Sequence, residues 1–260
     1  MTTHAVRRTA LAASAAALVL LVTACGGSSD DGKKDDGNAK ADPTASAAPA
    51  AKALTADELE KAALTQADLK SGKVTDKIAA DEDATKDKVT SDDAACLPLA
   101  HAQSGVAQGD PAATVKRSWT REPEKPSGDL SPEEMLLASM AVDQAFVTLS
   151  SYEGGAEQPL KDLAEAAGKC SGGFTTTVLG EELKVEKVAV TEAPEGGDEG
   201  LAFTLTVAAE EDVKMPQKVV VVRKGATLAS FTAVNFASAA TGEDFAFPAE
   251  LVDAQLPKLG

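Results

Sequence analysis

The sequence has few aromatic residues, few histidines and little positive charge. Its 260 residues include one Trp, one Tyr, seven Phe and two His, and 41 acidic residues against 25 Lys and Arg give a net charge of −16. Nucleic acid is not an expected partner, because phosphate binding needs clustered Lys and Arg. Stacking on sugar rings or bases is also disfavoured, because the aromatic platforms for it are scarce.

Several enzyme motifs are missing as well. The sequence contains no Gly-x-x-x-x-Gly-Lys phosphate loop and no Gly-x-Ser-x-Gly nucleophile elbow. Outside the N-terminal leader, His101 is the only imidazole, which is too little for a zinc site and is more typical of a structural residue. We therefore expect no cofactor, no metal and no catalytic residue.

The first 24 residues have the three zones of an export signal. Arg7 and Arg8 form the positive end, residues 10–22 form an apolar core, and small residues precede Cys25. The core is shorter than the about 20 apolar residues that span a bilayer, so we expect residues 1–24 to be removed. Twin-arginine export fits the two arginines, but the rest of that motif is poor and the general route is favoured.

Val22-Thr23-Ala24-Cys25 resembles the bacterial lipobox, in which a small or apolar triplet precedes the modified cysteine. The resemblance implies that the Cys25 sulfur receives a diacylglyceryl group and becomes the mature N-terminus. Two acyl chains hold a protein stably at a membrane, whereas one holds it marginally. We expect a lipid-anchored protein on the extracytoplasmic face of the cell membrane. The alternative, an ordinary secretory leader, leaves the tether-like Gly-Gly-Ser-Ser that follows unexplained.

Removal of the leader takes away two arginines and no acid, so the net charge moves from −16 to −18. It also leaves Cys96 and Cys170 as the only cysteines besides the lipidated one. An exported protein folds in an oxidising compartment, so we expect these two to form a disulfide. The bond would close a loop of about 75 residues and stabilise the fold by about 4 kcal/mol in the chain-entropy model.

The mature chain divides into a tether and one domain. Residues 25–53 are rich in Gly, Ser, Ala, Asp and Lys and have no bulky apolar side chain, so we expect a disordered linker behind the lipid. Residues 54–260 are long enough to form a single α+β domain around one core.

Hydrophobic periodicity supplies the elements of that domain. Expected helices start at the capping box Thr55-Ala56-Asp57-Glu58 and cover 94–103, 156–169 and 248–256, with a helix start or turn at 131–134. Expected strands cover 74–78, 112–121, 140–149 and a meander from Phe174 to Phe236, whereas 80–93 reads as a loop. The order favours an antiparallel β-sheet with a few flanking helices.

Details of the meander are also predicted. The apolar face shifts between Val185 and Val188, which indicates a β-bulge near Glu186-Lys187. The run Val219–Val222 is continuously apolar and favours a central strand, and Lys224-Gly225 favours a tight turn.

These marks occur together with Cys170 at the end of an amphipathic helix, Gly172-Gly173-Phe174 after it, and Gly196-Gly197-Asp198-Glu199 before a strand. The arrangement resembles the extracellular sensor domain of actinobacterial receptor serine/threonine kinases of the PknH type and the lipoproteins that share it. The resemblance covers 54–260 and implies an antiparallel sheet with flanking helices, a disulfide and a cleft for an unknown ligand. Family members carry two disulfides, whereas one pair is available here.

Arg117, Trp119 and Arg121 form the candidate ligand-binding group. A strand places all three side chains on one face, where the guanidinium groups can contact the indole ring. In an acidic protein this is a local cationic and aromatic spot for an envelope ligand. The alternative is that Trp119 covers the core and the arginine stems cover Trp119.

Two acidic patterns are weaker candidates. Asp81, Asp83, Thr85 and Asp92 match positions of a calcium loop, but Lys86 stands where that loop needs glycine. Glu133-Glu134 and Glu210-Glu211-Asp212 offer paired carboxylates for glycoside cleavage, although adjacent surface acids usually only interact with solvent.

The sequence therefore predicts a membrane-anchored, non-enzymatic lipoprotein whose domain senses an envelope ligand or binds a partner protein. One alternative is a lipid or glycolipid carrier with an apolar cavity. Another is a carboxylate-dependent cell-wall hydrolase.

Overall fold

The structure, a computed structural model, describes residues 52–123, 125, 128–209 and 213–259. The expected leader, the lipidation site Cys25 and nearly all of the expected tether lie outside these residues. So does the acidic triplet at 210–212. Among the described residues, no helix has the length and apolarity needed to cross a membrane.

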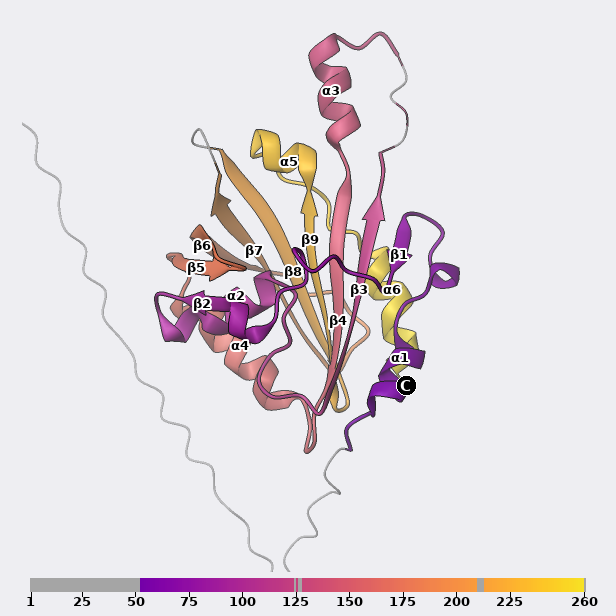
Figure 1. The fold of residues 1–260 in the computed structure, drawn as a ribbon, viewed down its shortest axis with the longest axis vertical. Coiled ribbons are helices and arrows are strands. Elements are labelled where there is room, and N and C mark those ends of the chain that lie inside the picture. Colours follow the sequence, from indigo (N-terminus) through magenta and orange to yellow (C-terminus); the bar gives the residue numbers. More distant parts are fainter. Residues whose placement is uncertain (1–51, 124, 126–127, 210–212, 260) are drawn as a thin grey trace, which may run out of the picture. The chain divides into compact units, whose positions relative to one another are not determined.

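Nine strands form one antiparallel sheet (Figure 1). The strands are β1 (Lys73–Thr75), β2 (Val89–Ser91), β3 (Ala113–Arg121), β4 (Asp143–Ser151), β5 (Phe174–Val178), β6 (Glu181–Thr191), β7 (Glu199–Ala208), β8 (Lys214–Lys224) and β9 (Thr227–Asn235). They lie side by side in the order β1-β3-β4-β9-β8-β7-β6-β5-β2. The apolar strand β8 is at the centre, as predicted, and the two shortest strands are at the edges.

The described helices are short, and their ends follow local sequence signals. They are α1 (Ala56–Ala62), α2 (Leu97–Gln103), α3 (Pro132–Met140), α4 (Glu157–Lys169), α5 (Phe236–Thr241) and α6 (Glu250–Gln255). Thr55 and Ser131 start α1 and α3 with complete capping boxes, each closed by a glutamate three residues later. The fold class is α+β, as the sequence predicts.

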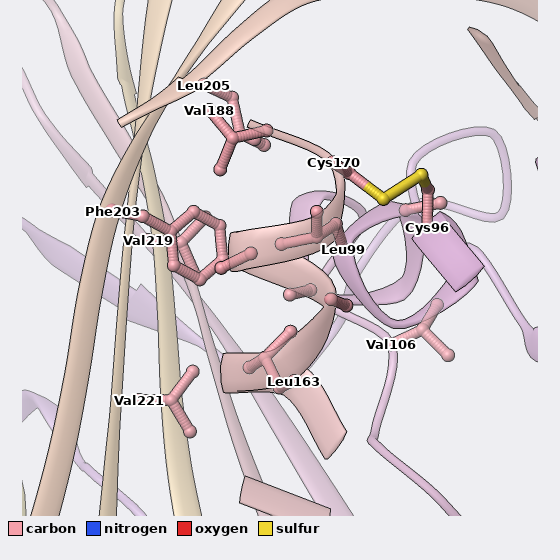
Figure 2. Packing of buried hydrophobic residues seen from close by; sticks show 14 of the residues in the cluster. Cys96, Leu99, Val106, Leu163, Cys170, Val188, Phe203, Leu205, Val219 and Val221 are labelled. Atoms are coloured by element: carbon pink, nitrogen blue, oxygen red, sulfur yellow. A yellow bond between two sulfur atoms is a disulfide. The ribbon is translucent and has the colours of Figure 1, made fainter. Parts of the chain in front are cut away.

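Helices cover both faces of the sheet. On one face α2 packs against β8 and β9, and α4 packs against β6, β7 and β8. Leu163 of α4 is fully buried in the same cluster as Phe203 and Val219 (Figure 2). On the other face α1 and α6 cover Trp119, Phe231 and their neighbours. Burial on both sides explains why 219–222 is continuously apolar, since alternate residues enter opposite cores.

Cys96 and Cys170 form the disulfide expected from the sequence, with their Cα atoms 5.9 Å apart. Cys96 lies directly before α2 and Cys170 ends α4, so the bond joins the two helices of one layer (Figure 2).

The predicted β-bulge is confirmed between Val185 and Lys187. Several element boundaries, however, differ from the prediction. The stretch 80–93, expected as a loop, contains the edge strand β2, which pairs with β5. The strand expected to end at Phe236 stops at Asn235, whose side chain accepts a hydrogen bond from Ser238 N–H and starts α5. The last helix begins at Glu250 rather than Pro248.

Candidate functional site

The candidate site is a hollow along β3. Strand β3 pairs with β4 over all of 113–121, but β1 covers only Ser118–Thr120 on the opposite side. Within the described part of the chain, Ala113–Arg117 therefore have no strand on their outer edge. A groove of about 770 Å³ runs there, and we call it the β3-edge groove. Its lining comprises Glu60, Asp76–Ile78, Asp83–Lys86, Val106, Ala107, Pro111 and Thr114–Arg117.

The floor of the groove is apolar and its walls are charged. Val106 and Ala107, which follow α2, are almost completely buried, and Val115 is half-buried. Around them stand four cationic and three acidic side chains: Lys77, Lys86, Lys116, Arg117, Glu60, Asp76 and Asp83. The groove thus carries a net charge of +1 in a chain whose net charge is −16.

Ion pairs fix most of these charges. Lys116 Nζ lies 2.7 Å from Asp83 Oδ1 and 2.8 Å from the Ala84 carbonyl oxygen, which ties the 83–86 segment to β3. Lys86 Nζ is 2.8 Å from Asp110 Oδ1. The pKa of Asp110 is lowered because Lys86 donates to it. Side chains held in this way give the groove fixed walls.

Arg117 is the candidate residue that reaches the groove. Its side chain is almost buried, and it donates through Nη2 to the Glu60 carboxylate and through Nε to the Leu64 carbonyl at 3.2 Å. Its Nη1 donates to the carbonyl of Lys116 at 2.9 Å. Arg117 therefore joins α1 and its following turn to the open part of β3.

Trp119 and Arg121 lie together, further along the strand. Trp119 is fully buried, and the Arg121 guanidinium carbon is 5.2 Å from the centre of its ring. Arg121 also contacts Asp143 at 2.6 Å and Glu250 at 2.8 Å. Of the three candidate residues, only Arg121 lines a separate hollow of about 420 Å³ at this end of β3, together with Ser71–Lys73, Thr120 and Glu122. Trp119 is thus buried in the core with the Arg121 guanidinium over its ring, whereas the polar contacts of Arg117 are with Glu60, Leu64 and Lys116.

The calcium pattern is not brought together. Asp83 binds Lys116, Thr85 donates to Asp87, and Asp92 accepts from the backbone of Thr175. Among the described residues, no group of three or more His, Cys, Asp or Glu side chains is placed to hold a metal.

Glu133 and Glu134 lie at the start of α3, on the surface. The pKa of Glu134 is lowered, because its carboxylate accepts a hydrogen bond from the backbone of Ser131. A general acid for glycoside cleavage needs the opposite shift. His101 lies on α2, and its pKa is lowered by burial and by nearby Lys86.

A second hollow, of about 530 Å³, is more apolar. It lies over β7 and β8 on the face covered by α6, with Ala202, Val220 and Phe247 in its lining. Lys218 is its only cation, and it pairs with the exposed Asp244 at 2.9 Å. This hollow is where a lipid carrier would hold its cargo.

Most of the groove could not be predicted from the sequence. Lys116 and Thr114 were on the predicted strand, but their role as a free edge depends on where β1 ends. Asp76–Ile78, which was expected to continue the strand, leaves β3 after Thr75. The expected loop begins only at residue 80, so the sequence pattern did not indicate that pairing with β3 would stop at Thr75.

Comparison with known proteins gives a limited result. No protein-family model matches the chain, and no curated protein matches it. Among solved structures, the extracellular domain of PknH from Mycobacterium tuberculosis is similar with 11% identity and a TM-score of 0.46, over 80% of this chain and 95% of that one. A putative uncharacterized protein from Mycobacterium smegmatis is similar with 11% identity and a TM-score of 0.34, over 81% and 98%.

Proposed function

We propose that this chain is an extracytoplasmic lipoprotein whose domain binds a ligand or a partner protein of the cell envelope in the β3-edge groove. The lipid on Cys25 anchors it to the membrane, and residues 25–53 act as its tether. The domain is not an enzyme: it presents a fixed surface. The groove carries the proposal, because it combines an apolar floor with polar walls held by ion pairs, as binding sites commonly do.

The proposed attachment is consistent with the charge of the domain. An acidic body is repelled by anionic lipid headgroups, so the acyl chains supply the membrane affinity. The disulfide is consistent with an oxidising compartment. Mass spectrometry of the mature chain tests the anchor, since a diacylglyceryl group on Cys25 adds its mass to the N-terminal peptide. An N-terminal peptide without acyl groups would contradict it.

Binding is tested by thermal unfolding of the full chain in the presence of three envelope fractions: membrane lipids, cell-wall glycan and exported proteins. A bound ligand raises the melting temperature by mass action. The blocking variant is Thr114→Trp, which fills the groove from an exposed position on β3. The control is Thr90→Trp, at an exposed position of β2 on the opposite edge of the sheet.

We expect one fraction to stabilise the chain without substitutions and the Thr90→Trp variant, but not the Thr114→Trp variant. Equal stabilisation of both variants would place the ligand elsewhere and refute the groove. If only lipid stabilises, and Thr114→Trp has no effect, the apolar hollow over β7 and β8 becomes the site and the carrier function replaces this one.

A further inference from the structure

We infer that the occupant of the β3-edge groove is an extended peptide segment of a partner protein, which adds to the sheet as a strand beside Ala113–Arg117. The inference rests on the proposed function and specifies its ligand class. It follows from the backbone of β3, from the lining of the groove and from the way β1 ends.

The backbone of β3 offers free hydrogen-bonding groups to the groove. Backbone N–H and C=O groups alternate between the two sides of an antiparallel strand. Tyr152 N–H donates to the Ala226 carbonyl beyond β4, so Ser151 and every second residue before it face β3. In the register of β3 with β4, this turns the backbone groups of Thr114 and Lys116 toward the groove.

The edge at these two residues is open. Thr114 is exposed, and neither residue has a strand partner on this side. The Lys116 carbonyl already accepts from Arg117 Nη1 at 2.9 Å, but a carbonyl has two lone pairs and can accept a second hydrogen bond. An unpaired edge of this kind is a template for another strand.

A strand added in the groove would also have its two faces in contact with different parts of the lining. Thr114 and Lys116 belong to the face of the sheet that carries α2, together with Val106, whereas Val115 and Arg117 belong to the face that carries α1. A strand beside β3 would therefore send alternate side chains into two different environments. On the α2 side Val106 offers an apolar contact and Lys116 is already paired with Asp83, which favours apolar, uncharged side chains. On the α1 side the Arg117–Glu60 pair is already neutralised, which favours uncharged ones.

Strand β1 shows that this edge accepts an added strand. Its three residues pair antiparallel with Ser118–Thr120, and the chain then leaves the sheet. The position that β1 would occupy if it continued is the groove. The five residues of β3 without a strand on this edge, Ala113–Arg117, correspond to about 17 Å of extended chain, which is the length of a typical strand. Backbone pairing would supply affinity, and the two side-chain environments would supply selectivity, as in other strand-addition complexes.

The probe is a library of random ten-residue peptides displayed on phage and selected on the full chain. Selected peptides are synthesised unmodified, N-methylated at odd residues, and N-methylated at even residues. A strand beside one edge uses the N–H groups of alternate residues, so one methylated set should lose binding by about tenfold or more while the other set keeps it.

Protein variants test the same edge from the other side. Thr114→Pro removes the edge N–H and should weaken the peptides by about tenfold or more, because proline is tolerated on an edge but cannot donate. Ser91→Pro is the matched control. Leu179 N–H donates to the Lys88 carbonyl, so by the same alternation Ser91 faces away from β5 on the opposite edge. Melting temperatures near that of the unmodified chain establish that both variants fold.

The inference would be overturned by no peptide enriched above background, by binding insensitive to either methylation pattern, by binding unchanged by Thr114→Pro, or by a dimer in light scattering that Thr114→Pro dissolves. The last result would make a second copy of the chain the occupant. Replacement of residues 26–51 by Gly and Ser completes the test, because a gain of peptide binding would make the tether itself the occupant. After any of these results, the thermal-unfolding experiment can still support the groove as a binding site. It does so if an envelope fraction stabilises the protein and Thr114→Trp abolishes that stabilisation.

Discussion

The indole N–H of Trp119 donates to the carbonyl of Ser71, with the nitrogen and oxygen 3.2 Å apart. This bond satisfies the one polar atom of the largest fully buried side chain of the described domain. It also holds the turn before β1 against the C-terminal part of β3. The position of β1, and with it the point where the β3 edge becomes free, therefore depends on this contact.

Gly72 permits the contact, and Gly72→Ala should break it. A Cβ on Gly72 would lie 2.2 Å from Trp119 Nε1, and its φ of +72° already disfavours other residues. Gly225→Ala is the control, because φ is +57° there and no atom lies within 4 Å of the added Cβ. We expect Gly225→Ala to cost about 1–2 kcal/mol and Gly72→Ala about 1–3 kcal/mol more in urea unfolding. Equal losses would show that Trp119 moves aside freely.

Asp143→Ala should destabilise the fold through the end of β3. The Asp143 carboxylate is nearly buried and accepts from Arg121 at 2.6 Å and from the Asn235 amide at 2.8 Å. Its removal leaves the Asn235 amide without its acceptor and Arg121 with only one acid. Because Arg121 is 38% exposed, solvent screens part of the loss, and we expect about 2 kcal/mol.

The control is Asp244→Ala. It breaks the pair with Lys218, but the Asp244 side chain is 74% exposed, so chemical denaturation should detect almost no change. A loss as large as that of Asp143→Ala would mean that burial does not decide the strength of these pairs.

The elements predicted best are those fixed by local chemistry. The capping boxes at Thr55 and Ser131 depend on residues three apart, and the run 219–222 requires a strand covered on both faces. The bulge near Lys187 could also be predicted, because a register shift moves every following side chain to the other face.

The elements missed depend on tertiary partners. Strand β2 is three residues long and is fixed by pairing with β5, whose partner residues come 85 to 89 positions later. The shared face of Arg117, Trp119 and Arg121 followed from strand periodicity, but their burial depends on α1 and α6, which come from the two ends of the domain. Periodicity gives the face of a side chain and does not give what covers it.

Removal of the disulfide should lower stability substantially. We expect the double variant Cys96→Ala, Cys170→Ala to lose about 4 kcal/mol, because the bond constrains the unfolded chain over a separation of 74 residues. The double variant avoids a free thiol in the core between α2 and α4. The reduced, unmodified chain should melt at a similarly lowered temperature. If oxidised and reduced proteins melt together, the two cysteines are not joined in solution.

His101 should make the fold less stable as the pH falls below about 6.5. Burial, followed by the charge of Lys86, lowers its pKa from the ordinary value of 6.5. Below that value the unfolded chain takes up a proton that the folded chain does not, so stability is full above pH 6.5 and declines down to the folded pKa. His101→Gln should flatten this part of the profile in melting curves from pH 7.5 to 5.

Carboxylates with a lowered pKa, such as Asp68 bound to Lys258, affect stability only at lower pH. The stabilisation that they contribute is lost only as the pH falls below their ordinary pKa of 3.8. Lys86→Met is the second check. It removes the repulsion between the Lys86 ammonium and a protonated His101, raises the pKa of His101, and so narrows the pH range over which stability is lost. An unchanged profile in both variants would show that the imidazole is freely solvated.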